Sequence, residues 1–113
     1  GHFRELGLIK STAENLTAAI EGEEFEVAEM YPAYLEVAKL QEERGAQRSF
    51  GYALSAEKIH ADLYRTAREK AQAGDDIQLG IISICPVCGH TMEGEAPDRC
   101  PICGARKELY KVF

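Results

Sequence analysis

The sequence predicts a mainly α protein, in which a long antiparallel helical hairpin is followed by a small β module that carries four cysteines. Residues 11–73 are rich in Ala, Glu, Leu, Lys and Arg, all of which favour helix. From Ile77 onward, short β-branched runs alternate with Gly and Pro. We therefore predict a helical hairpin over residues 1–76 and a separate metal-binding module over residues 77–113.

Length, charge and hydropathy exclude several classes of protein. A chain of 113 residues makes one domain, or one small domain with an appendage. Its net charge of −6 argues against a nucleic-acid partner, because phosphates require a basic face. There is no run of about 18 apolar residues, so we expect no membrane-spanning segment. No secretory h-region opens this sequence, so we expect no signal peptide.

The ends of the hairpin carry local signals. Ser11-Thr12-Ala13-Glu14 fits a capping box, with Ser11 as the N-cap and Glu14 reaching back to it. Gly74, followed by two aspartates, is expected to end the helical region. Pro32 falls within the first helix and lacks an N–H, so we expect a kink just past the acidic cluster that precedes it.

Both predicted helices have an inward stripe at a spacing of three and four residues. In the first helix it comprises Leu16, Ile20, Glu23, Val27, Met30, Tyr34 and Val37, and in the second Phe50, Ala53, Glu57, His60, Tyr64, Ala67 and Ala71. Glu23, Glu57 and His60 interrupt these apolar stripes, and Glu26 lies one helical turn after Glu23. Glu24 and Glu29 are expected to be solvated.

Ionisable groups on a packed stripe indicate a metal site. A buried carboxylate costs several kcal/mol unless it is paired or binds a cation. Carboxylate oxygens together with imidazole suit iron or manganese. A helix with Glu23 beside a helix with Glu57-x-x-His60 is half of a ferritin-like di-iron carboxylate site. Two alternatives remain: Glu23 at a bundle edge with its carboxylate in water, and His60 as a hydrogen-bonded core histidine.

The register of the hairpin follows from these residues. Pairing Glu23 with His60, and Glu26 with Glu57, gives a common midpoint near residues 41–42. Facing residues of antiparallel helices are equally distant from the turn, so the turn is predicted at residues 40–44. Gly45 then opens the second helix.

The cysteines form a second candidate metal site with the pattern Cys85-x2-Cys88-x11-Cys100-x2-Cys103. Four thiolates with this spacing suit a tetrahedral metal. Each pair is followed by a glycine, which permits a positive φ, and each contains a proline that stiffens it. Tetrahedral sulfur ligation suits zinc and iron alike, and two disulfides are a weaker alternative. Since four thiolates complete the tetrahedron, His90 is expected to be an exposed loop residue.

These motifs resemble the rubrerythrin family over nearly the whole chain. Residues 22–32 resemble the third helix of the family's four-helix bundle, and residues 56–61 resemble the fourth. Residues 84–89 and 100–104 resemble its rubredoxin-like tail. The resemblance implies iron in both sites and reduction of hydrogen peroxide to water in the cytoplasm of anaerobes or microaerophiles. It also implies an electron-donor protein such as rubredoxin or an NAD(P)H-dependent reductase.

The resemblance also implies roles for individual residues. Glu23 and Glu26 match a Glu-x-x-Glu ligand pair, Glu57 a bridging carboxylate and His60 a terminal nitrogen ligand. Tyr31 matches a tyrosine near the di-iron site, and it completes the expected catalytic set. The implied ligands of the FeS4 iron are Cys85, Cys88, Cys100 and Cys103.

One departure from the family pattern is large. The family's first two bundle helices, with their own Glu and Glu-x-x-His, have no counterpart in these 113 residues. We therefore expect a homodimer in which two hairpins complete the bundle and share a di-iron site. The missing half could instead lie on another chain or segment. The alternative function is a metal-storage or scaffold dimer with a structural zinc ribbon.

Overall fold

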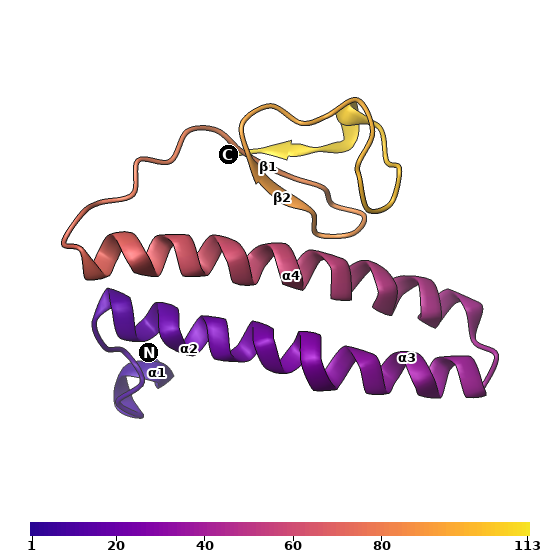
Figure 1. Cartoon of the computed structure of the whole chain (residues 1–113), viewed down its shortest axis with the longest axis horizontal. Helices are drawn as coiled ribbons and strands as arrows, with labels where there is room; N and C mark the ends of the chain where they lie inside the picture. The colour runs from indigo at the N-terminus through magenta and orange to yellow at the C-terminus, as the bar shows by residue number, and fades with distance from the viewer.

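The computed structural model describes residues 1–113 as a helical hairpin with a small sheet beside one of its helices (Figure 1). The helices are α1 (His2–Glu5), α2 (Thr12–Phe25), the π-helical segment η1 (Glu26–Met30), α3 (Tyr31–Leu40) and α4 (Arg44–Gln72). The strands are β1 (Ile82–Ile84), β2 (Thr91–Glu93) and β3 (Lys111–Val112), with a 3₁₀ turn η2 (Lys107–Leu109) before the last. The predicted mainly α class is confirmed. None of the helices combines the length and apolar character needed to cross a membrane.

The segments α2, η1 and α3 form one continuous helical arm. Ser11 caps it as predicted: its Oγ accepts from the Glu14 N–H at 3.3 Å, while its own N–H donates to the Glu14 carboxylate at 3.1 Å. The predicted kink near Pro32 corresponds to a π-helical segment that begins earlier than expected, at residues 26–30. Pro32 itself lies in the first turn of α3. Pro32 has no N–H to donate to the carbonyl of Ala28, so the arm changes its bonding pattern just before the proline.

The turn of the hairpin lies where the register predicts. The arm ends at Leu40 and α4 begins at Arg44, which leaves Gly45 in the first helical turn. Glu42 adopts a left-handed conformation with φ 57°, and the next N–H, of Glu43, bonds the Ala38 carbonyl at 2.9 Å. The C-terminal end of α4 also finishes with a left-handed residue, Gly74, whose φ is 78°. The next N–H, of Asp75, bonds the Lys70 carbonyl at 3.0 Å.

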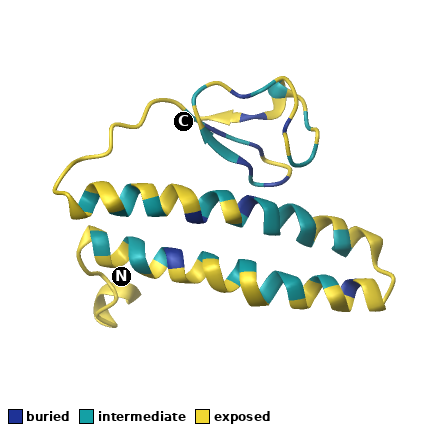
Figure 2. Cartoon of the chain, in the orientation of Figure 1, coloured by how far each residue is buried: buried dark blue, intermediate teal, exposed yellow.

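The arm packs along α4, yet the two helices bury little between them (Figure 2). The buried residues of the hairpin are Ile20, Ala38, Ala56 and Ala61. Other members of the predicted stripes stay open, including Tyr34 at 46% and Val37 at 52% exposure. A two-helix layer has no second layer to cover its apolar side, so this side is available to further helices.

The sheet of the C-terminal module is antiparallel with strand order β2-β1-β3. Ser83 stands at its centre, opposite Met92 on β2 and Val112 on β3. It is fully buried, and its hydroxyl donates to the Gly94 carbonyl at 2.7 Å. Beside the sheet, the core consists of three of the cysteines with Ala96 and Tyr110. The predicted boundary at residues 76/77 falls in the segment between α4 and β1, which has no helix or strand.

Candidate metal centres

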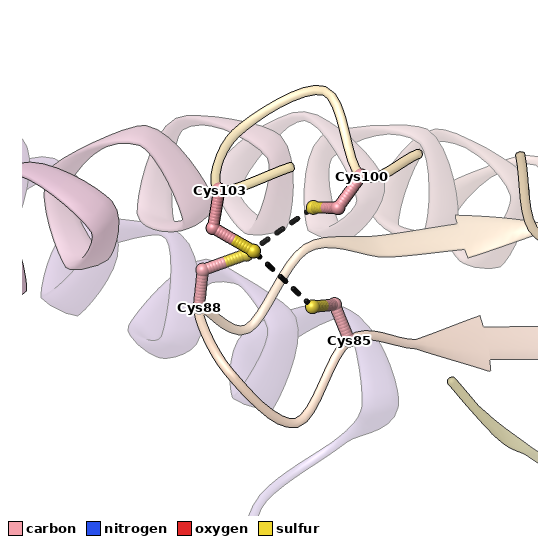
Figure 3. A group of neighbouring side chains, drawn as sticks. All are labelled: Cys85, Cys88, Cys100 and Cys103. Carbon is pink, nitrogen blue, oxygen red and sulfur yellow. Dashed lines mark hydrogen bonds between the residues drawn. The ribbon is translucent and has the colours of Figure 1, made fainter. Parts of the chain in front are cut away.

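The four cysteine sulfurs gather between the two Cys-x-x-Cys loops (Figure 3). Cys85 Sγ lies 3.7 Å from Cys103 Sγ, and Cys88 Sγ lies 3.5 Å from Cys100 Sγ. All four ligand atoms lie within 4.8 Å of one another. The cysteines are free, three of them buried and Cys103 partly buried, and the sulfur–sulfur separations are far from the roughly 2.05 Å of a disulfide. This arrangement favours the tetrahedral metal site over two disulfides.

The two loops share one backbone geometry. Gly89 and Gly104 have φ values of 86° and 75°. Their N–H groups donate to the carbonyls of Cys85 and Cys100, each at 2.9 Å. After Gly89, the His90 N–H donates to Cys88 Sγ at 3.4 Å. The repeated sequence thus produces a repeated turn, in which glycine supplies the left-handed residue that lets the next N–H face a sulfur.

His90 is not the exposed loop residue that the sequence predicts. Its side chain is only 7% exposed, and its Nδ1 lies 2.8 Å from the hydroxyl of Tyr110, which is equally buried. The module is too small to bury many aliphatic residues, so these rings fill the space next to the thiols. The four-thiol group does not include His90. Tyr110 was missed, although a tyrosine seven residues after the last cysteine was visible in the sequence.

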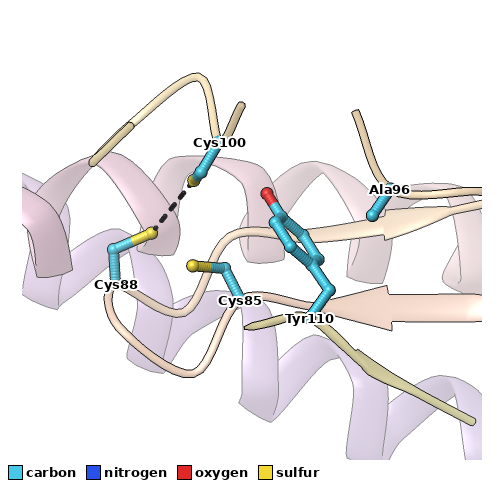
Figure 4. Packing of buried hydrophobic residues seen from close by; sticks show 5 residues of the cluster. All are labelled: Cys85, Cys88, Ala96, Cys100 and Tyr110. Carbon is cyan, nitrogen blue, oxygen red and sulfur yellow. Dashed lines mark hydrogen bonds between the residues drawn. The ribbon is translucent and has the colours of Figure 1, made fainter. Parts of the chain in front are cut away.

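Tyr110 lies beside the cysteine sulfurs (Figure 4). Tyr110 and Cys100 each shift the pKa of the other. Burial raises the pKa of Tyr110, and its hydrogen bond with Cys100 adds to this effect. For Cys100, burial acts against the thiolate, but hydrogen bonds from Tyr110 and from the backbone of Cys103 and Ile102 prevail. They lower the pKa of Cys100 to about 6. Cys100 therefore has a strong tendency to be the thiolate, the form that binds metal.

The hairpin brings three predicted ligands together. Glu23 comes from α2, and Glu57 and His60 come from successive turns of α4. One ligand atom from each lies within 4.8 Å of the others, and all three residues are partly buried. His60 Nδ1 lies 2.9 Å from Glu57 Oε2. Glu26 is a neighbour of Glu23 but does not belong to this three-residue group.

The electrostatics of this group fit a cation. Burial, followed by the proximity of Glu57 and Glu26, raises the pKa of Glu23 to about 8. Glu23 Oε2 is buried and has no hydrogen-bond partner. A bound cation would satisfy this oxygen and offset the repulsion between the carboxylates. The pKa of Tyr31 is raised by burial and then by Glu57, Glu26 and Glu23, so its phenol lies close to the same carboxylates and stays neutral.

The other ring nitrogen of His60 contacts the cysteine module of the same chain. Nε2 lies 3.0 Å from the Gly89 carbonyl and 3.2 Å from Thr91 Oγ1. A carbonyl can only accept, so Nε2 carries a proton, and Nδ1, beside Glu57, is the nitrogen that a metal would take. This is the orientation of a metal-binding histidine whose second nitrogen is held by a carbonyl. Sequence reasoning missed this contact, since nothing local links residues 29 positions apart.

Gly89 also allows the module to approach α4. A Cβ at this position would lie 3.4 Å from the Cβ of Ala56, and the positive φ independently disfavours other residues. Ala56 itself is 2% exposed. The small residues at this contact let the loop carrying Cys88 reach His60, so the two candidate metal sites are joined by a direct packing contact.

The raised pKa of Glu23 predicts a pH dependence for the metal-free protein. Between the unfolded value of 4.5 and the folded value of about 8, the folded state binds more protons than the unfolded state. The free energy of unfolding should therefore fall as the pH rises through this window. Urea unfolding in a chelator at several pH values measures it. Glu23→Gln should flatten the profile and Glu21→Gln, at an exposed position, should not. Identical pH profiles for the wild type and Glu23→Gln would contradict the prediction.

Comparison with known proteins places both parts of the chain in one family. The rubrerythrin family model matches residues 4–68, and the model described as the rubredoxin-like domain of rubrerythrin matches residues 84–111. Rubrerythrin-2 of Clostridium acetobutylicum is 50% identical over 100 residues, which cover 88% of this chain and 54% of that protein. Nigerythrin of Nitratidesulfovibrio vulgaris is 33% identical over 99 residues, covering 88% and 48%.

Solved structures of nigerythrin agree with this fold. The partially reduced state superposes with a TM-score of 0.80 at 32% identity, covering 93% of this chain and 51% of that one. The fully reduced, all-ferrous state gives 0.79 at 33% identity, covering 92% and 50%. This chain spans about half the length of the curated relatives it matches. The domain matches, the identity and the superposition agree, and the chain belongs to the rubrerythrin family.

Proposed function

We propose that this chain forms part of a non-haem iron oxidoreductase that reduces hydrogen peroxide to water. The carrying observation is the contact between the two candidate metal sites: His60 faces Glu57 and Glu23 with one nitrogen and the Gly89 loop with the other. Bound iron would supply the redox chemistry, two electrons per peroxide from the carboxylate site and single electrons from the cysteine site. One relative has been solved in an all-ferrous state, which supports iron as the metal.

The residues of the hairpin have distinct proposed tasks. Glu57 contacts His60 at 2.9 Å and is a neighbour of Glu23, and we propose that it would bridge two metals, with Glu23 and His60 Nδ1 as terminal ligands. Glu26 begins the π-helical segment, and we propose it as a movable ligand, because π-helical turns offer a less regular backbone at functional sites. The neutral phenol of Tyr31 can donate a hydrogen bond to an oxygen atom at the site.

The contact through Gly89 gives the cysteine module a defined task. The path from Cys88 to the hairpin ligands runs along one residue of backbone and one hydrogen bond to His60. We propose that single electrons reach the carboxylate site by this route. They would come from a donor protein such as rubredoxin or an NAD(P)H-dependent reductase. The free thiols suit a reducing compartment, so we propose that the protein works in the cytoplasm.

Peroxide consumption by the iron-loaded protein tests this function. The chain should be reconstituted with ferrous iron without oxygen, reduced, and mixed with hydrogen peroxide, while the oxidation of the donor is followed. Each peroxide should consume two electrons and two protons and give two waters. A red, reducible cysteine site with iron-dependent peroxide reduction supports the proposal. A colourless zinc-loaded module with no peroxide turnover after iron loading would favour the storage or scaffold alternative.

We further propose that a second copy of the chain completes the bundle. One hairpin offers three carboxylates and one imidazole, too few for two irons, and a twofold axis would double this set. Exposed apolar side chains also indicate a second copy. Five of them on the hairpin are more than one third exposed: Phe25, Tyr34 and Val37 of the arm, and Leu63 and Tyr64 of α4. These residues would be covered in a four-helix bundle.

The expected result is a dimer of twice 12.5 kDa whose dissociation constant falls when iron is bound. Metal binding and association stabilise each other, because the metal binds ligands from both chains. Sedimentation velocity with and without chelator measures the effect, and Val37→Glu should weaken the dimer by placing a charge in the interface. A monomer that holds two bundle metals per chain would contradict this prediction, as would a dimer joined only through the cysteine modules.

A further inference from the structure

Two buried side chains next to the thiols have no task in the proposed function. His90 and Tyr110 are each only 7% exposed, and they meet through Nδ1 and the phenol oxygen at 2.8 Å. Their rings pack edge to face, with centroids 6.0 Å apart and an interplanar angle of 82°. Figure 4 shows the phenol oxygen of Tyr110 turned toward the sulfur atoms. These two residues form a buried pair beside the cysteine site.

The pair contacts two of the four cysteines. The backbone N–H of His90 donates to Cys88 Sγ at 3.4 Å. Tyr110 packs in the same buried cluster as Cys100, and its phenol oxygen is turned toward the sulfur atoms, where it is placed to hydrogen-bond Cys100 (Figure 4). A cysteine that binds metal is a thiolate, which can only accept, so the phenol would donate its one proton to the Cys100 sulfur and its oxygen would accept from His90 Nδ1. In the metal-bound module the bonds would then run in one direction, from the imidazole N–H through the phenol to the Cys100 thiolate.

We propose that the His90–Tyr110 pair raises the reduction potential of iron held by the four cysteines, as a positioning pair that acts through Cys100. This inference rests on the proposed function only in requiring iron in the module. Uptake of one electron, with no proton, adds one negative charge to the centre. A hydrogen bond donated to a ligand sulfur stabilises the more negative, reduced state more than the oxidised state. The imidazole N–H strengthens this bond by polarising the phenol.

The chain provides a matched control in Tyr52. This tyrosine, from α4, also packs against the cysteine cluster and is partly buried. Its hydroxyl has no hydrogen bond to a cysteine. Replacing either tyrosine by phenylalanine removes one oxygen and keeps the ring that packs against the module. The two variants therefore separate the hydrogen bond to sulfur from the effect of packing.

The experiment is a redox titration of the iron-loaded chain of 113 residues, followed by the thiolate-to-iron charge-transfer bands. Tyr110→Phe should shift the Fe(III)/Fe(II) equilibrium about tenfold toward the oxidised form, a decrease of about 59 mV for one electron. Tyr52→Phe should titrate like the wild type. An unchanged potential in Tyr110→Phe, or an equal decrease in Tyr52→Phe, would overturn the proposal.

Variants of His90 test the hydrogen bond between His90 Nδ1 and the Tyr110 phenol. They also test the proposal if Tyr110→Phe does not fold. His90→Asn keeps an N–H donor near the position of Nδ1 and should stay close to the wild-type potential. His90→Leu removes the donor and should lower the potential in the same direction as Tyr110→Phe, by a smaller factor. Equal potentials for His90→Leu and the wild type would contradict the pair. The charge-transfer bands report iron in the module independently of activity. A wild-type protein that shows the predicted shifts in potential but no peroxide turnover would therefore count against the proposed function alone.

Discussion

Replacing Glu57 by alanine is expected to reduce peroxide turnover by more than about 100-fold. Glu57 is the carboxylate between Glu23 and His60, and its Oε2 lies 2.9 Å from His60 Nδ1. Its loss removes the proposed bridging ligand and one contact that orients the histidine. The charge-transfer spectrum of the cysteine site should stay unchanged, because its four ligands lie on the separate loops between β1 and η2.

The measurement combines peroxide consumption, iron content and the visible spectrum of one preparation. Glu21→Ala is the matched control, since Glu21 lies on the same helix as Glu23 but is exposed to solvent. It should retain wild-type turnover and iron content. Parallel loss of turnover and of the cysteine-site bands in Glu57→Ala would show that the modules do not bind metal independently. Wild-type turnover in Glu57→Ala would exclude Glu57 as a ligand.

Replacing Cys88 by serine is expected to have the opposite pattern, with loss of the red colour and retention of metal in the hairpin. Cys88 is 8% exposed, and its Sγ lies 3.5 Å from that of Cys100. Three thiolates and a serine hydroxyl no longer supply the four sulfur ligands of an FeS4 site. Turnover with an external protein donor should then fall, because the proposed electron route through Gly89 starts at this site.

Val87→Ala is the control for this variant, because Val87 lies in the same loop and is 53% exposed. It should keep the colour and the bands. Metal analysis separates the two sites: Cys88→Ser should lose one iron per chain and keep the hairpin iron. A Cys88→Ser protein that still showed the rubredoxin-like spectrum would refute the four-thiolate assignment.

Local sequence signals determined much of the fold. The capping box at Ser11, the stop at Gly74 and the turn near residues 40–44 depend on residues that lie next to one another in the chain, and the structure confirms each. The same holds for Glu57 and His60, because a spacing of three residues places both on one face of any helix. The paired loops, too, follow from their own glycines and cysteines. Each of these features needs only the backbone geometry of a few neighbouring residues.

The remaining features were decided by contacts between distant residues. His90 was predicted to be exposed, but it is buried because Tyr110 approaches it from 20 residues away. A kink was predicted just past the acidic cluster, but residues 26–30, which include Glu26 and Glu29 of that cluster, are π-helical. Glu26 also lies outside the group formed by Glu23, Glu57 and His60. The contact of His60 with the Gly89 carbonyl, and the raised pKa of Glu23, exist only once the module and the two helices are packed together. Burial and the distances between charges depend on the whole fold, so a local sequence pattern cannot predict either.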